Sequence, residues 1–123
     1  MMRPNRLVLF AAAGMLILAG CGSAGSGSND KIAVTATDDS CEIADTELPA
    51  GTHTFAVRND GEQVTEFYVY EGDKVVSEVE NISPGTTRDL TVELGKGSYE
   101  GACKPGMKGD GIRTRITVAG KPD

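Results

Sequence analysis

The chain has 123 residues, enough for one folded domain, and it contains three Cys, a single His and no Trp. It is acidic, with 12 Lys and Arg against 18 Asp and Glu. Without Arg3 and Arg6, which lie in a segment that we expect to be removed, 10 basic residues face 18 acidic ones from Cys21 onward, a net charge of −8. Such a chain lacks the basic surface that attracts phosphate backbones, so its composition excludes nucleic acid as an expected partner and favours cations as ligands.

Residues 1–20 have the features of a secretory signal peptide. Two arginines precede an uncharged run of twelve residues, and small residues follow. The string Leu18-Ala19-Gly20-Cys21 resembles the lipobox of bacterial lipoproteins, which implies cleavage before Cys21 and lipidation of its sulfur. A transmembrane anchor is the alternative, but twelve helical residues rise only about 18 Å, against a hydrocarbon core of about 30 Å. We therefore expect a lipid-anchored protein on the extracytoplasmic face of a bacterial membrane, in the cell envelope or periplasm.

Residues 21–30 combine the cysteine to be lipidated with a segment rich in Gly and Ser. Such a composition is typical of a flexible tether. The tether is short, so the folded domain, expected over residues 31–123, should stay near the lipid headgroups.

From residue 31 onward, short segments of alternating apolar and polar residues are separated by turn residues, and no helical spacing persists. In the second of these segments, Phe55 and Val57 share one face, and Asn59-Asp60-Gly61 then ends it. A hairpin is predicted around Glu71-Gly72-Asp73. The expected strands are 32–36, 52–59, 65–71, 74–82, 86–94, 98–103 and 112–119. Seven or eight strands at this spacing predict an all-β antiparallel sandwich or barrel.

Four strings along the chain resemble the cupredoxin-like domain of EfeO-type proteins, which are extracytoplasmic components of a bacterial iron-uptake system. The strings are Ala50-Gly51-Thr52-His53-Thr54-Phe55-Ala56-Val57-Arg58-Asn59, Glu66-Phe67, Glu80-Asn81-Ile82-Ser83-Pro84-Gly85 and Gly97-Ser98-Tyr99 leading to Cys103. The resemblance implies a Greek-key β-sandwich and a metal-binding role beside an iron permease or a peroxidase. Many members continue into a larger helical domain with a His-x-x-Glu motif, which this chain lacks, so we expect a free-standing version.

The ligands for blue copper are incomplete. That site requires two His and one Cys with a weak axial Met, whereas the chain has only His53. The segment Cys103-Lys104-Pro105-Gly106-Met107 keeps the Cys and Met of a copper-binding loop and lacks its His. We expect His53 to be a structural or surface residue and the scaffold to carry no type-1 copper.

Cys41 and Cys103 have two open interpretations. An oxidising compartment favours a disulfide between the only two cysteines left after lipidation. Alternatively, both thiols are metal ligands with the Glu66 carboxylate, because the resemblance places Cys41, Glu66 and Cys103 at motif positions of a metal site. Thiolates with Met107 favour copper(I), whereas carboxylates favour ferric iron. Both interpretations apply if the pair is a redox switch.

A second, carboxylate-only site is conceivable around Glu78 and Glu80. Their spacing of two places both side chains on one face of a strand. A solvated acidic face is the alternative. Lys104 and Lys108 should oppose a cation near the Cys103 loop.

The inventory of residues contains no catalytic motif, so we expect no enzyme. The leading hypothesis is a membrane-anchored metal-binding protein that carries an iron or copper ion at Cys41, Glu66, Cys103, Met107 or Glu80. The competing hypothesis is a disulfide-closed β-sandwich that binds a protein partner and no metal.

Overall fold

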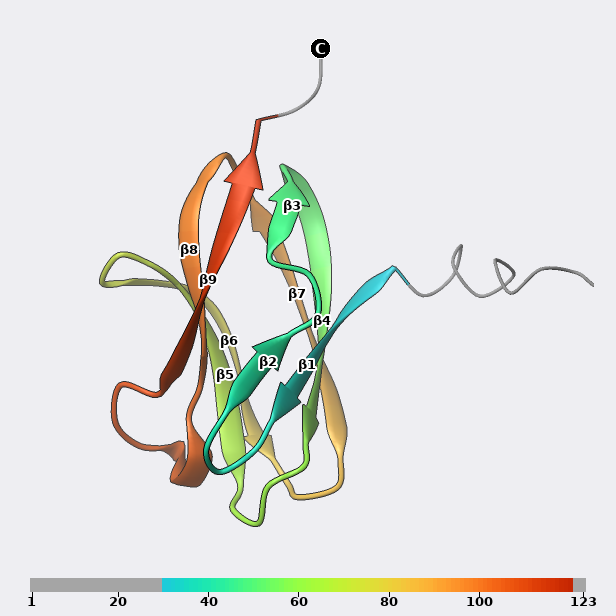
Figure 1. Cartoon of the computed structure of the whole chain (residues 1–123), viewed down its shortest axis with the longest axis vertical. Coiled ribbons are helices and arrows are strands. Elements are labelled where there is room, and N and C mark those ends of the chain that lie inside the picture. Colours follow the sequence, from blue (N-terminus) through green and yellow to red (C-terminus); the bar gives the residue numbers. More distant parts are fainter. Residues whose placement is uncertain (1–29, 121–123) are drawn as a thin grey trace, which may run out of the picture.

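A computed structural model describes residues 30–120, which form a β-sandwich (Figure 1). The expected signal peptide, the lipidated Cys21 and nearly all of the tether lie outside these residues. Nine strands and one 3-10 turn follow in chain order: β1 Lys31–Ala36, β2 Cys41–Ile43, β3 Glu47–Pro49, β4 Gly51–Asn59, β5 Thr65–Glu71, β6 Lys74–Ile82, β7 Thr87–Leu94, β8 Gly97–Cys103, η2 Pro105–Met107 and β9 Ile112–Ala119. Within residues 30–120, no helix is long and apolar enough to span a membrane.

The strands form two sheets. One has the order β2-β1-β4-β7 and the other has the order β3-β9-β8-β5-β6. Neighbouring strands are antiparallel except for the pairs β1–β4 and β3–β9, which are parallel. The all-β sandwich expected from the sequence is confirmed, and its sheets are mixed rather than purely antiparallel. The two strands that alternation did not predict, β2 and β3, have three residues each, too few to display a period of two.

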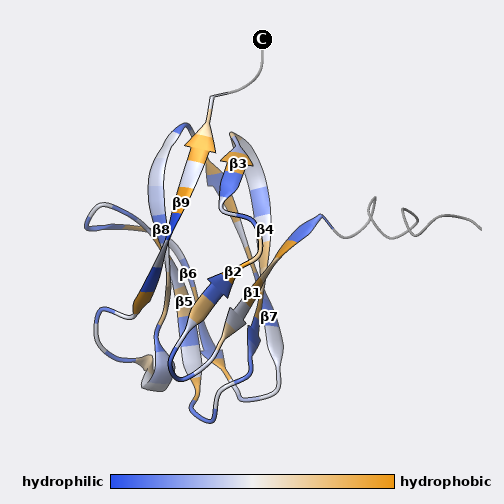
Figure 2. Ribbon diagram, in the orientation of Figure 1, coloured by the Kyte–Doolittle hydropathy of each residue, from blue (hydrophilic) through white to orange (hydrophobic). Residues whose placement is uncertain are grey.

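The core lies between the sheets and follows the pleat of each strand. Phe55 and Val57 of β4 are fully buried, as expected, and Phe55 lies 5.6 Å from Phe67 of β5, measured between ring centroids. The strands therefore carry hydrophobic and hydrophilic residues in alternation (Figure 2). Inward apolar side chains supply the main stabilising term of such a fold, because their surface leaves water on folding.

A β-bulge in β6 decides which of its residues face outward. Thr65 pairs with Ile82, but Phe67 pairs with Val79, so two residues of β6 lie opposite one residue of β5. Asn81 accommodates the extra residue with a φ of 57°. Val79 and Ile82 both reach the core, and the residue between the paired positions of β5, Glu66, lies across from the bulge.

Candidate functional site

The two cysteines are inside the sandwich. Cys41 of β2 and Cys103 of β8 are joined by a disulfide, with 5.4 Å between their Cα atoms, and this bond links the two sheets. Cys103 is fully buried and Cys41 is 6% exposed. Of the two open interpretations, the structure contains the disulfide. Its sulfur atoms are not thiolates, so they cannot serve as anionic metal ligands in this oxidation state.

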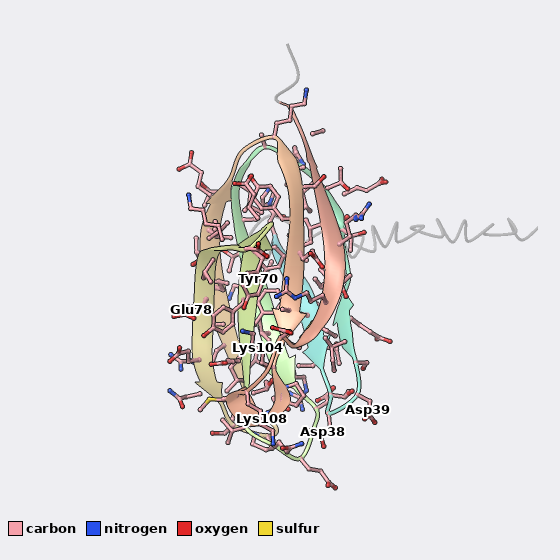
Figure 3. All side chains as sticks on the ribbon, turned by 90° about the vertical axis from the view of Figure 1, so that its left-hand side faces the viewer. Asp38, Asp39, Tyr70, Glu78, Lys104 and Lys108 are labelled. Carbon is pink, nitrogen blue, oxygen red and sulfur yellow. A yellow bond between two sulfur atoms is a disulfide. The ribbon has the colours of Figure 1, made fainter. Side chains whose placement is uncertain are left out.

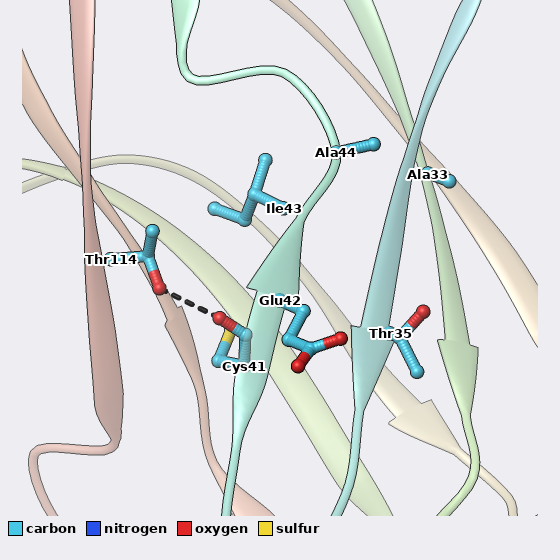
Figure 4. Close-up of a pocket in the computed structure, with 7 residues that line it drawn as sticks. All are labelled: Ala33, Thr35, Cys41, Glu42, Ile43, Ala44 and Thr114. Atoms are coloured by element: carbon cyan, nitrogen blue, oxygen red, sulfur yellow. Dashed lines mark hydrogen bonds between the residues drawn. The ribbon is translucent and has the colours of Figure 1, made fainter.

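A shallow groove of about 510 Å³ runs past Cys41. Figure 4 shows it between β1, β2 and β9, and the Thr114 hydroxyl donates a 2.7 Å hydrogen bond to the carbonyl oxygen of Cys41 there. The lining residues are Ala33, Thr35, Cys41, Glu42, Ile43, Ala44 and Thr114. A single carboxylate and a thiol that is already bonded do not make a metal site, so the groove beside the disulfide does not supply the expected ligands.

Glu66 does not join the cysteines. Its neighbour Phe67 is the register partner of Cys103, and both side chains lie in the core. Because side chains alternate across a strand, Glu66 lies on the opposite, outer face of the five-stranded sheet. The expected grouping of Glu66 with Cys41 and Cys103 is therefore not what the structure contains, since a sheet separates the carboxylate from the sulfur atoms.

The outer face of β5 and its neighbours instead brings glutamates and tyrosines together. Glu66, Tyr68 and Tyr70 follow one another on the outer face of β5, and Tyr68 pairs with Glu78 of β6. The Tyr68 hydroxyl donates a 3.4 Å hydrogen bond to Glu80 Oε1, which is long for a bond between two oxygen atoms. We call Glu66, Tyr68, Tyr70, Glu78, Glu80 and Lys104 the outer-face cluster. Figure 3 shows Tyr70, Glu78 and Lys104 on this side of the molecule.

Lys104 holds the cluster together from the loop after β8. It is 8% exposed, its Nζ lies 3.9 Å from the Tyr68 ring centroid, and it donates a 2.5 Å hydrogen bond to the Tyr70 hydroxyl. The two tyrosine rings stack with 5.6 Å between their centroids. Arg113 of β9 covers Tyr70, with its guanidinium carbon 4.1 Å from the ring centroid. Two cations are thus held by aromatic faces, each such contact contributing about 0.5–2 kcal/mol.

Glu66 is the least satisfied charged group of the cluster. It is 7% exposed, and among the described residues its carboxylate has no hydrogen-bond partner and no ion pair. Burial raises the pKa of this carboxyl, the nearby charge of Glu80 raises it further, and the Lys104 ammonium opposes both. A buried, unpaired carboxylate of this kind would gain from a cation.

Tyr68 is affected by the same glutamates. Its pKa is raised, first by the contact of its hydroxyl with the Glu78 carboxylate and then by burial and by the negative charges of Glu66, Glu78 and Glu80. The hydroxyl donates its 3.4 Å hydrogen bond to Glu80, while Glu78 lies directly across from Tyr68 in the sheet. The phenol therefore stays protonated and serves as a donor to the carboxylates.

The remaining candidate residues lie apart from one another. Met107 is 39% exposed in the 3-10 turn η2. His53 of β4 interacts through Nε2 with the carbonyl oxygen of Pro49 at 2.7 Å. Outside the cluster on the same sheet, Glu100 of β8 lies 3.8 Å from Arg113 of β9, between a carboxylate oxygen and a guanidinium nitrogen. Within residues 30–120, no three His, Cys, Asp or Glu side chains already stand close enough to hold a metal ion. Ion binding at the outer-face cluster would thus require the exposed Glu78 and Glu80 side chains to turn toward Glu66.

The sequence did not single out Tyr68 and Tyr70. Lys104 was expected to oppose a cation near the Cys103 loop, and its burial against the two tyrosine rings was not foreseen. The spacing of two between Glu66, Tyr68 and Tyr70 was the available signal, because it places all three on one face of a strand.

The chain is similar to proteins of one known family. Residues 8–118 match the family model of the cupredoxin-like domain. The chain is 33% identical over 106 residues to the iron uptake system component EfeO of Yersinia pestis, and the match covers 82% of this chain and 28% of that protein. The corresponding protein of Escherichia coli K12 is 34% identical over 73 residues, or 59% of this chain and 20% of that protein. The chain therefore spans less than a third of the length of these relatives.

Two solved structures share the fold. Dithionite-reduced auracyanin from Roseiflexus castenholzii superposes with a TM-score of 0.59 at 15% identity, covering 76% of this chain and 99% of that one. A multicopper oxidase superposes with a TM-score of 0.51 at 10% identity, covering 72% of this chain and 41% of that one. At these identities the likeness concerns the fold alone.

Proposed function

The chain belongs to the cupredoxin-like domain family, and from that premise we propose that it is an extracytoplasmic protein that captures a hard metal cation at the outer-face cluster. Its likeness to EfeO proteins, which are named as iron uptake system components, supports iron as the cargo. We propose the ferric ion, and an iron permease or a peroxidase of the same system as the partner. Lipidation of Cys21 and the tether over residues 21–30 would keep the domain, residues 31–123, at the membrane surface.

The observation that carries the proposal is the state of Glu66. Glu66 as a residue is only 7% exposed, and its carboxylate has no hydrogen bond or ion pair within the described chain; withdrawing such a charge from water is costly unless a counter-charge reaches it. Glu78 and Glu80 add two more carboxylates on the same face, and the Tyr68 hydroxyl adds a neutral oxygen. Oxygen ligands of this kind suit hard cations.

Copper fits the oxidised protein less well. A blue-copper centre needs two imidazoles and a thiolate, whereas His53 is the single histidine and both core cysteines are in the disulfide. A copper(I) site of Cys41, Cys103 and Met107 would first require reduction of that disulfide. Ferric iron at the carboxylates requires no such step, so we favour it.

Lanthanide luminescence tests the proposal. Terbium(III) is a hard, oxygen-preferring cation, and excited tyrosine transfers energy to it at close range, so binding beside Tyr68 should produce sensitised emission. We expect saturable emission from the wild type and an affinity at least about tenfold lower in Glu66→Gln and in Glu80→Gln, since each removes one anionic ligand. Competition by ferric nitrilotriacetate should abolish the signal.

Glu93→Gln is the matched control. Glu93 is exposed on β7 of the other sheet, so the substitution makes the same change in net charge away from the cluster. It should alter the affinity less than twofold. If Glu93→Gln weakens terbium binding as much as Glu66→Gln does, the cause is the net negative charge of the chain. If terbium binds saturably and Glu66→Gln leaves the affinity unchanged, the site is not at Glu66.

The second candidate function is a protein-interaction module that holds no metal. The disulfide favours it, because a cross-linked sandwich needs no ion for its stability. Cation binding by the disulfide-bonded protein separates the two candidates, because both contain the bond. Absence of free thiols together with absence of terbium, ferric and cupric binding would support the module, and metal uptake at Glu66 would exclude it.

A further inference from the structure

Lys104 occupies a place that the fold makes for it. Its backbone N–H donates a 2.8 Å hydrogen bond to the carbonyl oxygen of Glu66, which fixes the two residues side by side across β5 and the end of β8. Its stem lies beside Gly111. A Cβ at Gly111 would come within 2.9 Å of Lys104 Cγ and of the Cys103 carbonyl oxygen, and Gly111 has a φ of 79°. The backbone hydrogen bond and the space at Gly111 thus fix the position of Lys104 on this face.

The ammonium is held without a carboxylate. Nζ contacts the Tyr68 ring and the Tyr70 hydroxyl, and within the described residues it forms no ion pair. The exposed Lys31 differs from it, since Lys31 pairs with Asp89 at 2.7 Å. Attachment to aromatic rings leaves the glutamates of the cluster free while the positive charge stays near them.

We propose that Lys104 is an internal counter-cation that competes with the arriving metal ion for the glutamates of the outer-face cluster. This inference rests on the function proposed above and concerns the control of that site. In the empty protein the ammonium partly neutralises Glu66, Glu78 and Glu80. When the metal ion binds, repulsion drives the ammonium away from the Tyr68 ring, and its return favours release. Affinity is thereby kept low enough for the cargo to be passed on.

A purely structural role for Lys104 is the competing explanation, and it makes a different prediction. If the lysine only packs against the tyrosines, its removal lowers stability and leaves cation affinity unchanged or weaker. If it competes with the ion, removal tightens binding even where the fold is slightly destabilised. Affinity and stability should therefore change in opposite directions.

Terbium titration of variants tests the inference. Lys104→Gln and Lys104→Met should each bind terbium(III) about tenfold more tightly or better, as expected for removing one nearby like charge, and Lys104→Arg should remain within about threefold of the wild type. Lys108→Gln is the matched control, because it removes the same charge from an exposed position of the same loop. It should change the affinity less than twofold. Lys104→Gln and Lys104→Met are both used so that misfolding of one variant leaves the other to report the affinity.

Nuclear magnetic resonance supplies a readout that does not depend on affinity. The ε-methylene protons of Lys104 should resonate upfield in the free protein because of the Tyr68 ring, and saturating lanthanum(III), which is diamagnetic, should move them toward the position of a solvated lysine. Wild-type binding with no tightening in the Lys104 variants, or with an unmoved resonance, would overturn this inference alone. Absence of binding in the wild type and in both uncharged variants would overturn the proposed function as well.

Discussion

Two charged groups on the four-stranded sheet and two on the five-stranded sheet lie in opposite environments. On the four-stranded sheet, Lys31 pairs with Asp89 at 2.7 Å, and both side chains are almost half exposed. On the five-stranded sheet, Lys104 is buried without an ion pair and Glu66 is buried without a partner. Exposed pairs contribute little and need no explanation beyond solubility. Buried charges that remain unpaired cost free energy, so the second face is the one where a functional explanation is required.

Removal of the disulfide between the two sheets should have the largest effect on stability. Cys41→Ala combined with Cys103→Ala should lower the free energy of unfolding by about 4 kcal/mol, because the bond closes a loop between residues 62 positions apart. Urea denaturation would measure the change. Each single substitution should cost at least as much as the pair. A loss below about 1 kcal/mol would mean that the two sheets hold together without the bond.

A side chain added at Gly111, beside the stem of Lys104, should have the next largest effect on stability. Gly111→Ala should destabilise the protein by about 2 kcal/mol, since the added methyl is strained at positive φ and collides with the Cys103 carbonyl oxygen and the Lys104 stem. Gly109 has a similar φ of 77° but open space around it, so Gly109→Ala should cost only about 1 kcal/mol. Thermal unfolding of both variants isolates the contribution of the contact. If both variants lose the same stability, the atoms next to Gly111 shift without cost to accommodate the added methyl group.

A pair of lysine substitutions sharpens the contrast between the faces. Lys104→Gln should lower the free energy of unfolding by about 1 kcal/mol, through loss of the ring contacts and of the bond to Tyr70. Lys31→Gln should cost less than about 0.5 kcal/mol, because its ion pair is exposed. Chemical denaturation at low and high salt provides the measurement. Salt should change the Lys31 effect more than the Lys104 effect, and the reverse order would contradict the contrast.

The smallest effect concerns pH. Burial and the charge of Glu80 place the folded-state pKa of Glu66 above its ordinary value of 4.5, so the folded protein binds that proton more tightly than the unfolded chain does. The free energy of unfolding should therefore fall as pH rises from about 4.5 through the folded-state pKa, and the penalty is complete above it. Glu66→Gln should be more stable than the wild type at neutral pH, by a smaller margin than the effects above, and nearly equal to it at pH 4.

Glu93→Gln serves as the reference for that experiment, because Glu93 is exposed on β7 of the four-stranded sheet. Its difference from the wild type should stay small and should not change across the same pH range. If both variants gain equally at neutral pH, the cause is the net negative charge of the chain rather than the burial of Glu66.

Alternation and turn residues were enough to predict most of the fold. The inward placement of Phe55 and Val57 and the hairpin at Gly72 agree with the structure. The strands β2 and β3 were missed, because three residues cannot show a period. The resemblance to the cupredoxin-like domain of EfeO-type proteins is confirmed by the family match and by the relatives.

The site was harder to predict, because it depends on register. Pairing of Phe67 with Cys103 places Glu66 on the far side of the sheet from the sulfur atoms, and no local feature of the sequence encodes that pairing. The bulge at Asn81 brings Glu80 opposite Glu66 and is equally hidden from alternation. The charge of Lys104 suggests a solvated side chain, whereas it is 8% exposed, and the lack of a side chain at Gly111 leaves room for its stem.

The disulfide also divides the chain topologically. Its covalent loop runs from β2 to β8, so β1 and β9 lie outside it, although each is hydrogen-bonded to strands within the loop. Either terminal strand can detach while the loop stays closed, because no covalent constraint opposes that motion. Native-state hydrogen exchange should then show a subglobal opening in which amides of β1 and β9 exchange before those of β5 and β8. The strands that carry Glu66 and Cys103 would form the most persistent part of the molecule.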